Sequence, residues 1–171
     1  MNYFSHSSDR LNFRKLTNED IPNWLEFFEN NPGLHFLGMD LSKSYLELAT
    51  GWITAQFERY ENQGLGHLAI ELKETGEFIG MAGIIPRELN EKNYFEIAYS
   101  LKPRFWGYGY AAEAAQHLKK FGRDSGLSEH FISIIDLDNF PSQKVAQKNN
   151  MEILFKTDYL GMEVFIFGTS N

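Results

Sequence analysis

One glycine-containing segment, residues 104–112 with the sequence RFWGYGYAA, holds the residue types best suited to binding chemistry. Gly107 and Gly109 let the backbone approach a ligand closely and leave amide groups pointing outward. The segment stands between a predicted strand and a predicted helix, and a helix N-terminus offers up to four unpaired N–H groups at the positive end of its dipole. With Lys102 and Arg104 nearby, this pattern predicts an anion site best suited to phosphate. The structural alternative is a glycine turn that only joins the helix to the sheet.

Different kinds of phosphate binding compete for this segment. A phosphate-loop NTPase needs Gly-Lys-Ser/Thr, a tripeptide that the chain does not contain. The dinucleotide fingerprint G-x-G-x-x-G/A is matched by Gly107, Gly109 and Ala112, but that fingerprint opens the first unit of a parallel sheet. Asp136, after the next predicted strand, keeps a dinucleotide-binding domain open as an alternative, because the fingerprint also needs an acidic residue. A further interpretation depends on the elements around the segment.

Hydrophobic periodicity and capping signals predict those elements. A short strand at residues 11–16 is followed by two helices, the first capped by Thr17 and the second opened by a capping box of Ser44 and Glu47. Pro86 is expected to end a later strand. Three strands with short connections form an antiparallel meander, at residues 67–72, 78–85 and 94–101.

Helices and strands alternate in the rest of the chain. A helix at residues 108–124 ends at Gly126, and Asn139 caps a short helix that reaches Asn149. The remaining strands lie at residues 131–135, 153–159 and 162–167. The order β-α-α-β-β-β-α-β-α-β-β predicts one α/β domain over residues 1–171. Its sheet is mixed and mostly antiparallel, with one parallel β-α-β unit.

This order, together with Arg104-x-x-Gly107-x-Gly109, resembles the GNAT superfamily of acyl-CoA N-acyltransferases, whose pyrophosphate loop reads Arg/Gln-x-x-Gly-x-Gly/Ala. The resemblance covers nearly the whole chain. It implies acetyl-CoA as cosubstrate, with the pyrophosphate on backbone amides and the acyl carbonyl on an amide near Ser100. The cofactor-binding residues that it implies are Ser100, Leu101, Arg104, Trp106, Gly107, Tyr108, Gly109, Tyr110, Ala111 and Asn139.

The sequence NFPS at residues 139–142 is similar to the Asn-x-x-Ser pattern of the branch that acetylates the N-termini of ribosomal proteins. In that branch the strand before the loop often carries Glu, a small residue and an aromatic, as EIAY does at residues 96–99. The branch resemblance implies a protein N-terminal α-amine as acceptor, with a small amine as the close alternative. Members usually continue with Lys-x-Gly-Phe. Asn150 can replace that glycine as a left-handed C-cap, and Met151 can fill the aromatic position.

Acyl transfer from a thioester to an amine needs a base for the amine, a donor for the carbonyl oxygen and a donor for the departing thiolate. We assign the base to Glu96, with Asp136 and Asp138 as rivals, and the resemblance assigns the thiolate donor to Ser142. Strand alternation puts Glu96 on the face of Ser100 unless a bulge intervenes. The chain has no cysteine, so a cysteine acyl-enzyme is excluded and direct attack in a ternary complex is expected. The alternative is that these polar residues lie on the exposed surface and have no catalytic role.

The net charge is −7, from 16 Lys and Arg against 23 Asp and Glu, which is not the basic footprint of a nucleic-acid binder. Residues 1–101 carry 8 basic and 15 acidic side chains (8 − 15 = −7), whereas residues 102–171 carry 8 of each (8 − 8 = 0). We therefore expect the C-terminal part to bind the polyanionic cofactor and the acidic part to face a cationic amine.

Composition also bounds the class of protein. We expect a cytoplasmic protein, because there is no cysteine, no signal peptide and no run of about 18 apolar residues that would cross a membrane. The 5 histidines lack the spacing of metal ligands, so no metal is expected. The edge of the closing hairpin could support a homodimer. A non-catalytic CoA-binding sensor or interaction domain is the alternative to an enzyme.

Overall fold

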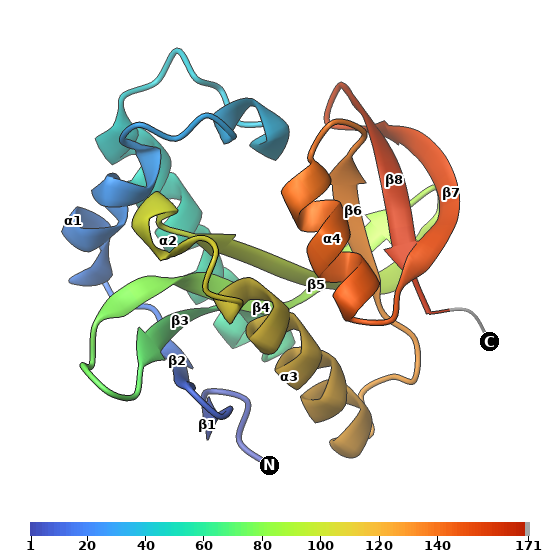
Figure 1. The fold of residues 1–171 in the computed structure, drawn as a ribbon, viewed down its shortest axis with the longest axis horizontal. Coiled ribbons are helices and arrows are strands. Elements are labelled where there is room, and N and C mark those ends of the chain that lie inside the picture. Colours follow the sequence, from blue (N-terminus) through green and yellow to red (C-terminus); the bar gives the residue numbers. More distant parts are fainter. Residues whose placement is uncertain (170–171) are drawn as a thin grey trace.

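Eight strands build one sheet, in the order β1-β2-β3-β4-β5-β6-β8-β7, in a computed structural model that describes residues 1–169 (Figure 1). Every pairing is antiparallel except β5 with β6, which is parallel. The predicted mixed, mostly antiparallel α/β fold is confirmed. The strands are β1 Ser5–Ser7, β2 Leu11–Lys15, β3 Gly66–Leu72, β4 Phe78–Leu89, β5 Lys92–Leu101, β6 Ile132–Asp136, β7 Glu152–Tyr159 and β8 Met162–Gly168.

Helices cover both faces of the sheet (Figure 1). The α-helices are α1 Asp20–Trp24, α2 Tyr45–Gln63, α3 Tyr110–Asp124 and α4 Phe140–Lys148, and the 3₁₀ turns are η1 Leu25–Phe28, η2 Leu34–Leu37 and η3 Pro103–Phe105. Successive strand residues point to opposite faces. Leu68 accordingly packs in the core under α3, whereas Ala69 packs in the core under α1 and α2. No helix within residues 1–169 is long and apolar enough to cross a membrane.

The parallel pair β5 and β6 determines where a site can form. The two strands are in register at one position, Glu96 opposite Ile132. Ser133 then donates from its hydroxyl to the carbonyl of Ile97 at 2.8 Å. Beyond that point the strands separate, and Figure 1 shows α4 and the β6-β8-β7 part of the sheet diverging from β5. The separation opens the sheet between the end of β5 and the end of β6.

Several local predictions are confirmed. Ser44 and Glu47 form a capping box at the start of α2. Asn139 Oδ1 accepts a hydrogen bond from the amide of Ser142 at 3.4 Å, so it caps α4. Asn150 has the left-handed φ of 56° that a C-cap position requires. These signals depend only on neighbouring residues, which is why sequence suffices for them.

Other local predictions need correction. Pro86 does not end β4, which continues to Leu89, because β3 pairs with β4 only as far as Ile84 and the free edge beyond it tolerates proline. Thr17 does not cap α1, because the Asp20 carboxylate accepts from the Thr17 amide instead. The short strand β1 was not predicted, and α3 begins at residue 110 rather than 108.

Candidate active site

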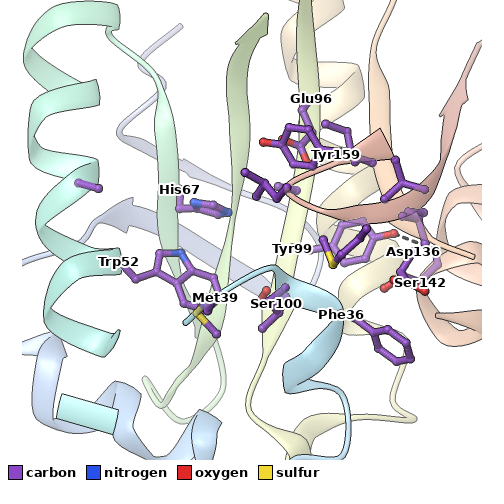
Figure 2. A pocket seen from close by; sticks show the side chains of 18 of the residues that line it. Phe36, Met39, Trp52, His67, Glu96, Tyr99, Ser100, Asp136, Ser142 and Tyr159 are labelled. Atoms are coloured by element: carbon purple, nitrogen blue, oxygen red, sulfur yellow. Dashed lines mark hydrogen bonds between the residues drawn. The ribbon is translucent and has the colours of Figure 1, made fainter. Parts of the chain in front are cut away.

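Two cavities meet where β5 and β6 separate. The first, of about 460 Å³, has Glu96 in its wall and is called the Glu96 cavity (Figure 2). The second, of about 510 Å³, has Gly107 and Gly109 in its wall and is called the glycine-loop cavity. The residues common to both walls are Phe36, Leu37, Tyr99, Ser100, Asn139 and Ser142. A molecule in one cavity can therefore reach a molecule in the other through this junction.

The glycine loop has the backbone conformation that an anion site needs. Gly107 and Gly109 have φ of 85° and 81°, in the left-handed region that favours glycine, and α3 begins immediately after them. Within residues 1–169 the amides of Gly107, Tyr108 and Gly109 have no hydrogen-bond acceptor, so they are available to a ligand. The first-turn amides of α3 and its dipole add to the same site.

The other residues predicted to bind the cofactor lie mostly around this cavity. Ser100 and Asn139 lie at its junction, and Leu101, Trp106, Tyr110 and Ala111 line it further along. The Trp106 indole donates to the carbonyl of Leu101 at 2.8 Å, which fixes the ring across the loop. The Tyr108 side chain does not line the cavity, because it is exposed and stacks on Tyr110. Tyr108 can therefore contribute its amide but not its ring.

The positive charges of Arg104 and Lys102, expected at the loop, are neutralised elsewhere. The Arg104 guanidinium lies 2.6 Å from carboxylate oxygens of both Glu26 and Glu77, and Lys102 Nζ lies 3.7 Å from Glu26. Neither side chain lines the glycine-loop cavity. The turn η3 buries Phe105 and leaves Arg104 half-exposed on the side of the two glutamates. The structure therefore does not bring the Arg104 side chain to the predicted site.

Arg10, which the sequence did not single out, supports the glycine loop instead. Its Nη1 donates to the carbonyl of Tyr108 at 2.9 Å, and its Nε donates to Glu113 at 2.6 Å. The guanidinium also lies over the ring of Tyr110, 4.5 Å from its centroid. Arg10 thus joins the loop to the first turn of α3 and to the strand region before β2.

Glu96 is buried in the wall of the Glu96 cavity, with a side chain 9% exposed. Its Oε2 accepts from Arg87 Nε at 2.6 Å, and Oε1 has no hydrogen-bond partner within residues 1–169, so it is available to a ligand. Burial alone would lower the pKa of Arg87. The charge of the Glu96 carboxylate and its hydrogen bond to Arg87 have the larger combined effect, so the pKa of Arg87 is raised. The ladder between β4 and β5 has no register shift, so Glu96 and Ser100 share a face as strand alternation predicts.

Ser142 lies at the junction, near the phenol of Tyr99 (Figure 2). The Tyr99 hydroxyl donates to the Ser142 carbonyl at 2.9 Å, which ties β5 to α4 across the opening. Burial, and then the nearby charge of Glu96, raise the pKa of Tyr99, so its phenol stays protonated at neutral pH. Ser142 thus lies in both cavity walls, between Glu96 and the glycine loop.

The two rival bases differ in position. Asp136 lines the Glu96 cavity, and its Oδ1 accepts from the amide of Asp138 at 2.9 Å. Asp138 is exposed and lines neither cavity. Asp136 therefore has the position that a rival to Glu96 requires, whereas Asp138 lies in the turn before α4, outside both cavities. No group of three or more potential metal ligands occurs within the described part of the chain.

The inner wall of the Glu96 cavity contains groups that the sequence did not suggest. His67 is 7% exposed, and its Nδ1 has no hydrogen-bond partner among residues 1–169. Burial, followed by the charges of Arg59 and Arg87, lowers the pKa of His67 to about 3, so its imidazole is neutral at pH 7. Arg59 lines the same cavity and donates to Gln56 Oε1 at 3.2 Å.

A family model described as an acetyltransferase (GNAT) domain matches residues 10–152. The chain therefore belongs to the GNAT acetyltransferase family. Among curated relatives, the uncharacterized protein YkkB of Bacillus subtilis (strain 168) is 28% identical over 146 residues, which cover 84% of this chain and 83% of YkkB.

Solved structures share the fold. An acetyltransferase from Agrobacterium tumefaciens str. C58 superposes with a TM-score of 0.78 at 24% identity, over 98% of this chain and 94% of that one. RimL, a ribosomal L7/L12 α-N-protein acetyltransferase solved in complex with coenzyme A, superposes with a TM-score of 0.74 at 20% identity, over 94% of each chain. At these identities the similarity concerns the fold alone.

Proposed function

We propose that this protein transfers an acetyl group from acetyl-CoA to a primary amine by direct attack within a ternary complex. The observation that carries the proposal is the junction of two cavities at the opening between β5 and β6. One cavity offers unpaired amides to phosphate, and the other offers a buried carboxylate to an amine. A donor and an acceptor that are bound side by side have already lost the entropy that their encounter in solution would cost, so the acetyl transfer between them is accelerated.

The glycine-loop cavity is the proposed donor site. The free amides of residues 107–109 and the N-terminus of α3 suit a pyrophosphate. The pantetheine arm would run past Leu101 and Asn139 toward the junction, with the acyl carbonyl near the backbone of Ser100. Support comes from RimL, which has this fold and whose structure contains coenzyme A.

The chemistry uses residues on either side of the junction. The amine nitrogen attacks the acetyl carbon, and the new C–N bond replaces the C–S bond. The amine proton passes to Glu96, directly or through water. The Ser142 hydroxyl donates a hydrogen bond to the departing thiolate, which then takes up a proton from solvent while Glu96 releases its own. The sequence contains no cysteine, which supports direct transfer over a cysteine-linked intermediate.

The acceptor is proposed as a small amine or a protein N-terminal α-amine. RimL is described as an α-N-protein acetyltransferase, which supports the second possibility through shared fold. We propose the cytoplasm as the compartment, because a sequence without cysteine suits a reducing environment. We also propose a homodimer through the edge strand β7, where Ile153 and Leu154 are 49% and 43% exposed, and light scattering would test its mass.

The rate of CoA release with a panel of amines tests the assignment of roles. Glu96→Gln should lower kcat by about 10²-fold or more, the usual effect of removing a general base, and Ser142→Ala by about tenfold. Asp138→Asn is the matched control, because Asp138 is exposed outside both cavities, and it should keep the wild-type rate. Wild-type rates in both site variants would show that these roles are misassigned.

Binding measurements separate the proposal from its alternatives. Acetyl-CoA should raise the melting temperature, whereas NAD should not. Stabilisation by NAD without stabilisation by CoA would favour a dinucleotide-binding domain. Stabilisation by acetyl-CoA without turnover of any amine would favour a non-catalytic sensor.

A further inference from the structure

The charges on the inner wall of the Glu96 cavity do not cancel. Arg87 and Glu96 form one ion pair, with Nε and Oε2 2.6 Å apart. Arg59 is half-buried beside them, and its guanidinium donates only to the neutral Gln56 among the described residues. Burial and then the like charge of Arg87 lower the pKa of Arg59, while the charge of Glu96 raises it. Two guanidinium groups thus share one carboxylate, which leaves a net charge of about +1 at this wall.

The other charged residues that line this cavity are Asp40, Lys43, Glu47 and Asp136, so its lining sums to a formal charge of 3 − 4 = −1. None of these carboxylates forms an ion pair with Arg59 within residues 1–169. Asp40 and Glu47 are exposed, and their carboxylates accept from the backbones of Ser42 and Ser44. The carboxylate of Asp136 accepts from the backbone of its own turn. None of the three contributes to the pKa of Arg59, whereas Glu96 does. The uncompensated guanidinium is therefore open to an anionic ligand group.

His67 gives an independent indication of a ligand at the same wall. Its imidazole is more than nine-tenths buried, faces the cavity in Figure 2, and has an Nδ1 without a partner in residues 1–169. A buried polar atom left unpaired is costly, so such atoms are normally satisfied by protein, water or ligand. The neutral ring can donate one N–H to an oxygen atom. Nδ1 is itself inaccessible, but Nε2 also has no hydrogen-bond partner in residues 1–169 and is not among the inaccessible atoms, so an anionic oxygen in the cavity can accept from Nε2 of His67 and from Arg59.

The charge at the inner wall and the volume of the cavity indicate which class of ligand fits. A carboxylate carries one negative charge, which matches the excess at this wall, whereas a phosphate monoester carries about −1.5 to −2. Residues of η2 and of the β7–β8 hairpin line the cavity, and the two segments pack closely against each other. A methyl group at Gly38, just after η2, would lie 3.1 Å from Leu160 and Met162 of the β7–β8 hairpin. A space of about 460 Å³ has the volume of a small-molecule site.

We propose that the acceptor is a small primary amine that also carries a carboxylate, as an amino acid does. Arg59 and His67 hold the carboxylate, and the free Oε1 of Glu96 faces the amine. This inference rests on the proposed acetyl transfer and specifies its substrate class. Arg59 and His67 then determine specificity, and Arg87 keeps Glu96 in place.

The experiment compares each of the nineteen common amino acids that have a primary α-amine with its primary amide as acceptor, by CoA release with acetyl-CoA. At least one amino acid should be acetylated, with a kcat/KM at least tenfold above that of its amide. Arg59→Gln should raise KM for that amino acid at least tenfold and change kcat/KM for the amide less than threefold. Arg59→Lys should restore part of the preference. Arg123→Gln, on the exposed side of α3, is the matched control and should keep the wild-type preference.

The outcomes separate this inference from the proposed function. If the amides react as well as the amino acids, or if the preference survives in Arg59→Gln, acetyl transfer stands and the carboxylate site is refuted. If none of the thirty-eight compounds reacts, the carboxylate site is also refuted, and a panel of polyamines, amino sugars and peptides then decides about acetyl transfer. Circular dichroism melting of each variant shows that the fold is intact.

Discussion

Removal of the Arg10 side chain should weaken binding of coenzyme A by about five- to thirtyfold. In Arg10→Ala the loop loses the hydrogen bond to the Tyr108 carbonyl, the ion pair with Glu113 and the contact with the Tyr110 ring. The Glu113 carboxylate keeps its bonds to Ser8 and to the amide of residue 10, so the anchor of α3 remains.

The magnitude follows from the contacts that are lost. A neutral hydrogen bond contributes about 0.5–1.5 kcal/mol, an exposed ion pair about 0.2–1 kcal/mol and an exposed cation–π contact about 0.5–1 kcal/mol. Arg10 is 44% exposed, and the three contacts share one side chain, so their joint contribution is about 1–2 kcal/mol rather than the sum. If the loop must be ordered to bind pyrophosphate, that energy appears in the affinity, at about 1.4 kcal/mol for each factor of ten.

Calorimetric titration of coenzyme A into Arg10→Ala, Arg10→Lys and the wild type measures the effect. The lysine variant should recover only part of the affinity, because it cannot contact Tyr108 and Glu113 with a planar fork. Arg123→Ala is a matched control on the other end of α3, where its ion pair with Glu129 is long, at 4.0 Å. A dissociation constant for Arg10→Ala within twofold of wild type, in a protein with unchanged helix content, would refute the role of Arg10 as a support of the loop.

Two further predictions concern backbone conformation and pH. Gly107→Ala and Gly126→Ala both force alanine into a left-handed φ, of 85° and 73°, with open space around the new methyl group, so each should cost about 1 kcal/mol of stability. Only Gly107→Ala should also weaken coenzyme A binding in a titration, and equal affinities would contradict the proposed role of the loop. Burial, followed by the neighbouring His117, lowers the pKa of His6 from 6.5 to about 4. Between pH 4 and pH 6.5, His6 is therefore protonated in the unfolded chain and neutral in the folded chain. His6 therefore contributes stability above pH 6.5 that is lost as the pH falls toward 4. After a discount for the half-exposed ring, denaturant unfolding should show the wild type losing about 1–2 kcal/mol relative to His6→Phe between pH 7 and pH 4.5. Parallel pH curves for the two proteins would contradict this reasoning.

The sequence predicts well those features that depend on neighbouring residues. The capping box at Ser44, the cap at Asn139 and the left-handed Asn150 are each determined within one helical turn, and all are confirmed. The element order and the place of the glycine loop follow from hydrophobic periodicity and from Gly107. These local signals are sufficient to predict the fold family and to locate the loop.

The sequence does not predict the electrostatics of the site, because those depend on contacts between distant residues. Arg104 pairs with Glu26, which is 78 positions away, and Arg10 reaches Tyr108 across 98 positions. Division of the chain into an acidic part and a neutral part therefore does not show where the individual charges lie. Acidic residues of the first part neutralise Arg104, and the same part brings Arg59 and Arg87 to the cavity expected to be acidic.

The central claim is that acetyl-CoA and an amine meet at the opening between β5 and β6 and exchange an acetyl group directly. Mass spectrometry of the protein incubated with acetyl-CoA and the amine panel tests it most directly. The account predicts an N-acetylated amine and free coenzyme A in equal amounts, with no acetyl group left on the protein. Acetyl-CoA that binds and remains intact with every amine, or an acetyl group that accumulates on the protein before transfer, would contradict it.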